Sequence, residues 1–233
     1  MTGGIRRRMG VEERREQLIA VALELFGHRS PQDVSIDEIA EAAGISRPLV
    51  YHYFPGKQSL YEAAVRRAAQ ELAARFKEPH EGPLGARLLR VMERFFDFVD
   101  DHGPGFSALM RGGPAVNSGS TGAIIEEVRQ AAYEEILRHL EITRATPRVE
   151  LLVRSWVSHA ETTALLWLDG RRVPRAELER QLVHEFAAMA AVAAAYDEQV
   201  AELLRNIFAT EPVDSPFAEL VTRLATLLPL PAP

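Results

Sequence analysis

The chain has 233 residues, of which 47% are hydrophobic and 26% are charged, and it contains no cysteine. This composition is typical of a globular protein and excludes extensive disorder, a disulfide framework, a thiolate nucleophile and a Cys-type zinc site. The formal net charge of −6 is unusual for a protein that binds nucleic acid, so the distribution of that charge along the chain decides whether this class is excluded.

The first residues of the chain do not have the pattern of a secretory signal, and no apolar run has the length of a membrane span. Three arginines, Arg6 to Arg8, precede no apolar stretch, so they do not form a secretory signal. The longest apolar run, from Phe186 to Tyr196, is shorter than the roughly 20 residues that a membrane span needs. We therefore expect a cytoplasmic protein that does not bind membranes.

Apolar residues recur at helical spacing along almost the whole chain, and no stretch alternates with a period of two. Glycine and proline fall between the periodic stretches, where they end helices. We therefore predict an all-α fold. The predicted helices cover, in chain order, residues 11–27, 36–43, 47–54, 57–76, 84–102, 106–111, 123–140, 147–168, 174–196, 197–209 and 216–228.

The second and third predicted helices are short and lie close together. Ser35 and Glu38 have the spacing of a capping box, and Gly44 supplies the left-handed position that ends the first of the two helices. Pro48 falls in the first turn of the next helix, where proline is tolerated. This spacing fits a helix-turn-helix, and it fits a generic helical hairpin equally well.

The distribution of charge favours the helix-turn-helix. Residues 42–61 are twenty consecutive residues without Asp or Glu, and they hold three of the five tyrosines. Phosphate contacts need cations and hydroxyls, and they are opposed by carboxylates. Residues 1–57 contain eight basic and eight acidic residues, which leaves 19 basic and 25 acidic residues in the remainder. The excess of acid therefore lies entirely outside the candidate DNA-binding region.

The stretch VSIDEIAEAAGISRPLVYHYFPGKQSLYEAAV closely resembles the DNA-binding domain of the TetR family of bacterial transcriptional regulators, and the resemblance covers about residues 11–65. It implies a three-helix helix-turn-helix domain followed by a larger helical domain that binds ligands and dimerises. The expected domains are a flexible basic arm over 1–10, the DNA-binding domain over 11–56, the larger domain over 57–228 with 57–76 as connecting helix, and a tail over 229–233.

The resemblance also implies which residues contact double-stranded DNA. Arg47 either reads guanine O6 and N7 or clamps a phosphate, and Lys57 corresponds to a phosphate-binding lysine. Ser35 caps its helix first and touches phosphate second, while Tyr51 and Tyr53 either meet phosphates or pack in the domain core. The predicted DNA-binding residues are Ser35, Ser46, Arg47, Pro48, Leu49, Tyr51, His52, Tyr53 and Lys57. The arginines of the arm either lie along DNA or form a solvated tail.

In the family, the last two long helices pair with their copies across a two-fold axis, which suits an operator with two half-sites about 10 bp apart. Residues 147–168 are apolar on more than one face, as a helix buried on both sides is. Any single apolar residue here also fits ordinary core packing. The predicted dimer residues are Val157, Ala164, Leu168, Leu182, Phe186, Met189, Ala190 and Ala193.

The resemblance further implies a mostly apolar cavity for a small-molecule inducer within residues 84–168. Aromatic and methionine residues at this spacing are also typical of plain core. Ser155 is a further polar candidate, and residues 112–122 form either a gate or a linker. The predicted ligand-binding residues are Met92, Phe95, Phe98, Phe106, Met110, Trp156, His159 and Thr163.

We therefore expect a homodimeric regulator, a repressor more often than an activator in this family, that binds a palindromic operator and is released by a ligand. One alternative is a regulator without an inducer that is controlled by a protein partner. The other is a helical-bundle enzyme, which the absence of di-iron, HExxH, P-loop and GxGxxG motifs disfavours. We expect neither a cofactor nor a metal.

Overall fold

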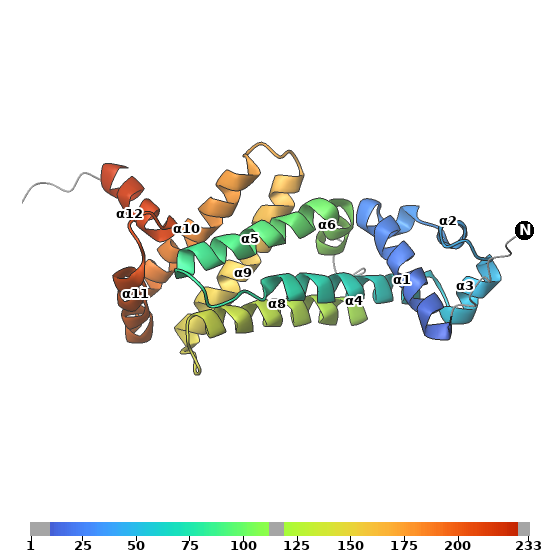
Figure 1. The fold of residues 1–233 in the computed structure, drawn as a ribbon, viewed down its shortest axis with the longest axis horizontal. Helices are drawn as coiled ribbons and strands as arrows, with labels where there is room; N and C mark the ends of the chain where they lie inside the picture. Colours follow the sequence, from blue (N-terminus) through green and yellow to red (C-terminus); the bar gives the residue numbers. More distant parts are fainter. Residues whose placement is uncertain (1–9, 112–118, 228–233) are drawn as a thin grey trace, which may run out of the picture. The chain divides into compact units, whose positions relative to one another are not determined.

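A computed structural model describes residues 10–111 and 119–227 (Figure 1). Within these ranges the chain forms α-helices and one short 3-10 helix, with no strand, which confirms the predicted all-α fold. The helices are α1 (Val11–His28), η1 (Pro31–Asp33), α2 (Ile36–Ala42), α3 (Arg47–Tyr53), α4 (Lys57–Phe76), α5 (Leu84–Asp101), α6 (Gly103–Arg111), α8 (Ser120–His139), α9 (Pro147–Leu168), α10 (Arg175–Ala194), α11 (Glu198–Thr210) and α12 (Pro216–Leu227).

The chain divides into two compact units. The first consists of Met1–Glu71 and Asp101–Ile124, and the second of Leu72–Asp100 and Ile125–Pro233. The first unit therefore takes up most of α4, the whole of α6 and the first residues of α8 in addition to α1, α2 and α3. The boundary expected after residue 56 falls inside this unit, because packing joins segments that are far apart in the sequence.

The first unit has a continuous apolar core. It is formed by the inward-facing residues of α1 to α4, with Ile124 added from α8. Phe26 meets Tyr61 edge to face, with ring centroids 5.1 Å apart. The fully buried side chains of this core include Leu18, Val34, Ile39, Val50 and Leu60. Together they fix α2 and α3 against α1 and α4.

Helix α6 starts earlier than expected. The segment Gly103 to Gly105 reads as a helix break in the sequence, whereas it forms the first turn of α6. Pro104 is tolerated there because the first turn of a helix has no intrahelical use for its N–H group. Helix α8 likewise begins at Ser120, three residues before the predicted start.

The second unit is held together by aromatic and ionic contacts. Trp156 on α9 meets Phe186 on α10 edge to face at 5.3 Å, and its indole N–H donates to the Leu182 carbonyl at 3.0 Å. At the start of α10, Arg175 donates to Asp97 of α5 at 2.6 Å and to Glu179 at 2.6 Å. These contacts bury one face of α9 and one face of α10 within the second unit.

Candidate nucleic-acid interface

Helices α2 and α3 meet at a tight turn that local chemistry dictates (Figure 1). The Ser35 hydroxyl accepts from the Glu38 N–H at 3.1 Å, while the Glu38 carboxylate accepts from the Ser35 N–H at 2.7 Å, so the predicted capping box is present. Gly44 has φ +65°, the left-handed conformation that glycine adopts without a steric penalty. Ser46 is the N-cap residue of α3, and its hydroxyl makes no cap bond.

Helix α3 has one buried and one exposed face. Val50 is fully buried and Phe54, just beyond the helix, is almost so, because both pack in the core of the first unit. Tyr51 is 43% exposed, so it belongs to the surface and not to the core. The residues of the exposed face are Ser46, Arg47, Pro48, Leu49, Tyr51 and His52. Six of the predicted DNA-binding residues thus share one continuous surface.

The guanidinium of Arg47 is held between two neighbours. Its Nη1 donates to Oδ2 of Asp37 at 3.0 Å, and its central carbon lies 5.7 Å from the centroid of the Tyr51 ring. A hydrogen bond with Tyr51 and the charge of Asp37 raise the pKa of Arg47, so the side chain stays cationic. This arrangement presents a positive, planar fork of donors at the outer start of α3.

Tyr53 and His52 lie at the end of α3 with their rings edge to face at 5.2 Å. Tyr53 is half-buried and packs against the core of the first unit, so of the two tyrosines it is the one with a core contact. Through its ring contact it also supports the exposed imidazole of His52.

Two predicted phosphate-binding residues are engaged with the protein itself. The Lys57 ammonium donates to the carbonyls of Pro31 and Val34 at 2.9 and 3.1 Å, so it ties the start of α4 to the η1–α2 segment. The Ser35 hydroxyl is used by the capping box. Arg29, which donates to Glu38 at 2.7 Å, and the Ser35 N–H lower the pKa of Glu38 to about 2. Lys57 is thus first a structural lysine of this segment.

The absence of acids from residues 42–61 did not predict that the carboxylate of Asp37 lies on the same surface as Arg47. Asp37 lies five positions before this stretch begins, yet the turn brings its carboxylate to Arg47. Counting charges along the chain cannot detect a contact between residues ten positions apart on two different helices. Only the pairing of α2 and α3 shows that one carboxylate belongs to the surface.

The residues predicted to line a ligand site are divided between the two units. Phe106 and Met110 lie on α6 in the first unit, whereas the others belong to the second unit. Met92, Phe95, Phe98 and Trp156 are buried, and Thr163 is half-buried. The inward orientation predicted for His159 is wrong: the side chain is 42% exposed and contacts Glu185 at 2.8 Å. Ser155 is exposed as well.

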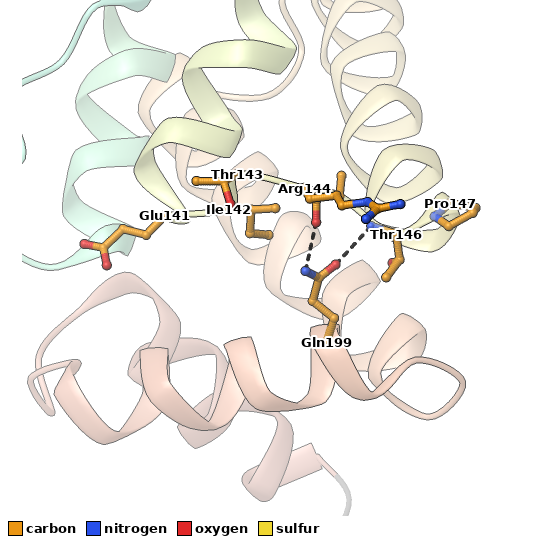
Figure 2. A pocket seen from close by; sticks show the side chains of 8 residues that line it. Glu141, Ile142, Thr143, Arg144, Thr146, Pro147 and Gln199 are labelled. Carbon is orange, nitrogen blue, oxygen red and sulfur yellow. Dashed lines mark hydrogen bonds between the residues drawn. The ribbon is translucent and has the colours of Figure 1, made fainter.

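A cavity of about 620 Å³ lies elsewhere in the second unit, at the connection between α8 and α9. Figure 2 shows Gln199 bridging this connection: its amide accepts from the Thr146 N–H at 3.0 Å and donates to the Arg144 carbonyl at 3.1 Å. None of the residues predicted to bind ligand lines this cavity. Its polar groups serve to join α11 to the start of α9.

Most of the residues predicted for a dimer interface are covered by their own chain. Val157, Ala164, Leu182, Phe186 and Ala190 are buried in the second unit. Within a single chain these five side chains serve the core, and their place in a dimer interface stays a prediction. Only Leu168, Met189 and Ala193 keep part of their surface. The outer face of α9 instead carries Leu151, Ser155, Ser158, Thr162 and Leu166.

Two other predictions concern residues outside the ranges 10–111 and 119–227. The arginines of the arm, Arg6 to Arg8, and most of the segment 112–122 lie outside the described residues. In the ranges that are described, no helix is long and apolar enough to cross a membrane. The same ranges contain no group of three or more His, Asp or Glu side chains arranged to hold a metal ion.

Both units match known protein families. Residues 18–64 match the model of "Bacterial regulatory proteins, tetR family", and residues 84–189 match "Tetracyclin repressor-like, C-terminal domain". A crystal structure of a TetR-family transcriptional regulator from Streptomyces coelicolor is 70% identical to this chain. The match covers 94% of this chain and 99% of that one, with a TM-score of 0.91.

Curated relatives match over shorter stretches. The transcriptional activator FasR of Mycolicibacterium smegmatis is 35% identical over 111 residues, which are 46% of this chain and 51% of FasR. The transcriptional regulator BetI of Cronobacter sakazakii is 34% identical over 101 residues, which are 42% of this chain and 50% of BetI. The chain thus spans about half the length of these curated relatives. Since all of these proteins are regulators and not enzymes, and the matches extend over both units, the chain belongs to the TetR family of bacterial transcriptional regulators.

Proposed function

We propose that the protein is a homodimer that binds a palindromic operator through α3 of each copy and is released by a small, largely apolar ligand. The observation that carries this proposal is the exposed face of α3, on which Arg47, Leu49 and Tyr51 stand out from a helix anchored by Val50. An α-helix that presents its first residues in this way suits the major groove of B-DNA.

The chemistry of this face supports the reading of bases together with phosphate contact. The Arg47 guanidinium matches the two acceptors of guanine, and the exposed Leu49 side chain suits the methyl group of thymine. The tyrosine hydroxyl and the imidazole of His52 are donors for phosphate oxygens. Arg47 and Leu49 thus supply sequence selection, whereas Tyr51 and His52 supply register on the DNA.

The outer face of α9 supports the dimer. Leu151 and Leu166 are large apolar side chains exposed on that face, and small polar residues lie between them. On α10, Val192 is another large exposed apolar residue, and the contact between His159 and Glu185 joins the two helices at the surface. Large apolar side chains exposed among small residues in this way suit a surface that a partner covers. Two copies related by a two-fold axis would present α3 to two half-sites.

The sign of regulation is a separate choice. We propose repression, because binding at a palindrome that overlaps a promoter excludes polymerase without a further contact. The relative FasR is named an activator, so the opposite sign is the second candidate. A reporter gene behind the selected operator distinguishes them: its expression rises on deletion of the regulator if the protein represses, and falls if it activates.

The test of DNA binding is selection of duplexes from a random library, followed by gel shifts at stated salt concentrations. We expect the wild-type protein to select a palindromic site. Arg47→Ala should weaken binding to it by about 1–3 kcal/mol, the value of a bidentate contact to guanine. Arg205→Ala is the matched control, because it removes an exposed arginine of α11 in the second unit. Failure of the wild-type protein to select any site contradicts the proposal.

A further inference from the structure

Asp37 lies in the first turn of α2, and Arg47 is the first residue of α3. Nη1 of Arg47 donates to both carboxylate oxygens of Asp37, at 3.0 Å to Oδ2 and 3.3 Å to Oδ1. The side chain of Asp37 is 64% exposed and that of Arg47 is 55% exposed, so the ion pair lies on the outer surface of the helix-turn-helix. It connects the two helices at the point where α3 presents its first residue.

An exposed ion pair contributes little to folding stability, because solvent screens it and both side chains lose freedom. The same carboxylate is unfavourable on a surface that approaches phosphates. Stability therefore does not explain an acid beside the principal cation of this surface.

The geometry does have a consequence for the guanidinium. Asp37 holds the Nη1 edge, and Tyr51 faces the group from the next turn of α3. A guanidinium fixed on two sides keeps its planar fork in one orientation, as bidentate recognition of guanine requires. An arginine without such contacts is free to swing to the nearest phosphate, which carries no sequence information.

We propose that Asp37 is a positioning residue that holds Arg47 for base readout, opposes its transfer to phosphate and so sets the discrimination between operator and unrelated DNA. This inference rests on the proposed function, because it concerns the same interface. In this role Asp37 increases the selectivity for the operator and weakens binding to DNA of any sequence.

The neighbouring acids of α2 provide the comparison. Glu38 is committed to the Ser35 cap and to Arg29. Glu41 is exposed on the same helix, and among the described residues its carboxylate has no bond to Arg47. Glu41→Gln therefore removes the same charge from the same helix without touching the Arg47 contact, and it is the matched control for Asp37→Asn.

The experiment measures the dissociation constant of the full chain for two duplexes across a series of KCl concentrations. One duplex is the site that the wild-type protein selects, and the other has the same composition in scrambled order. Asp37→Asn should bind the scrambled duplex about threefold to tenfold more tightly, with a salt slope steeper by about one. The ratio of the two affinities should fall by about fivefold to tenfold. Glu41→Gln should leave that ratio unchanged.

Two further variants separate positioning from a general effect of charge or folding. Asp37→Glu retains the carboxylate and should restore part of the ratio. In an Arg47→Ala background, Asp37→Asn should no longer change the ratio, because the residue through which Asp37 acts is gone. Thermal unfolding of each variant verifies that the first unit stays folded.

An unchanged ratio in Asp37→Asn overturns the inference while the proposed function stands. A decrease that persists in the Arg47→Ala background, or one that Glu41→Gln reproduces, also overturns it. If the wild-type protein selects no duplex at all, the proposed function itself fails, and the inference fails with it.

Discussion

The backbone carbonyl of Phe26 in α1 faces Gly105 in α6 so closely that a Cβ on residue 105 would collide with the carbonyl oxygen. The same Cβ would lie 3.1 Å from Cα of Gly27. Glycine at position 105 is therefore the condition for direct backbone contact between α1 and α6. Both helices belong to the first unit, so α6 is part of the same compact body as the helix-turn-helix.

Gly105→Ala should destabilise the first unit. Because the atoms in contact are backbone atoms, α6 has to move away from α1, and overpacking of this kind costs about 1–3 kcal/mol. Urea unfolding, followed by circular dichroism, measures the change in the free energy of unfolding. Gly56→Ala is the control, since nothing lies within 4 Å of the added methyl group there. Equal stability of the two variants would contradict the close packing of α6 on α1.

Lys57→Met should lower stability without changing the salt dependence of DNA binding. The variant loses two hydrogen bonds from a cation to the carbonyls of Pro31 and Val34, a loss of about 1–2 kcal/mol in the free energy of unfolding. Lys77→Met is the matched control, because Lys77 is the other lysine of the chain and is exposed. A salt slope reduced by about one, with stability unchanged, would instead establish Lys57 as a phosphate contact.

The second unit should lose stability as the pH falls from about 6.5 to about 4. Burial and the charges of Arg138 and Arg87 lower the pKa of His139 from 6.5 to about 4. Between these values the unfolded chain binds a proton that the folded chain does not, so acid favours unfolding. The guanidiniums of Arg87 and Arg138 face the two ring nitrogens at 2.8 and 3.1 Å, which accounts for the exclusion of a further positive charge.

His139→Gln should flatten this pH dependence, which urea unfolding at several pH values between 7.5 and 4.5 measures. His184, whose pKa burial also lowers, remains in the variant and leaves a residual slope. His28→Gln, a change at an exposed position of α1, serves as control and should keep the wild-type slope. A wild-type slope in His139→Gln would show that this imidazole is protonated normally in the folded chain.

Leu166→Glu should break the proposed dimer. Leu166 is 67% exposed on the outer face of α9, so a single chain accommodates the carboxylate, whereas a dimer buries it without a partner. We expect the dimer dissociation constant to rise by at least about 100-fold and affinity for the palindromic operator to fall with it. Light scattering after size exclusion measures the first effect. Val213→Glu, at a 93% exposed residue between α11 and α12, should leave the dimer intact.

The sequence was sufficient to predict the helices and the helix-turn-helix. The Ser35–Glu38 capping box, Gly44 and Pro48 act within a few residues, and helical periodicity is a local property, so the bounds of most helices were predicted to within a few positions. The starts of α6 and α8 were each predicted three residues too late, and in α6 the reason for Gly105 is its close contact with α1, which is not a local property.

The faces of the long helices were not predictable in the same way. Residues 147–168 are apolar nearly all round, which indicates burial on several sides without saying what covers each side. The structure assigns Val157 and Ala164 to the core of the chain and leaves Leu151 and Leu166 outside. His159, a polar residue in the same apolar stretch, lies on the exposed side of α9 and pairs with Glu185 at the surface. Its position was likewise not predictable from the apolar pattern.

The net charge, which first argued against DNA binding, shows which conclusions the sequence supports and which need the tertiary structure. Local composition identified a neutral first region with an acid-free window, and that was enough to point to a DNA-binding surface. Tertiary packing decided that Asp37 reaches this surface, that Lys57 is used within the protein and that α6 belongs to the first unit. Such pairings depend on how helices pack in three dimensions, and residues 10 to 80 positions apart leave no periodic trace of them in the sequence.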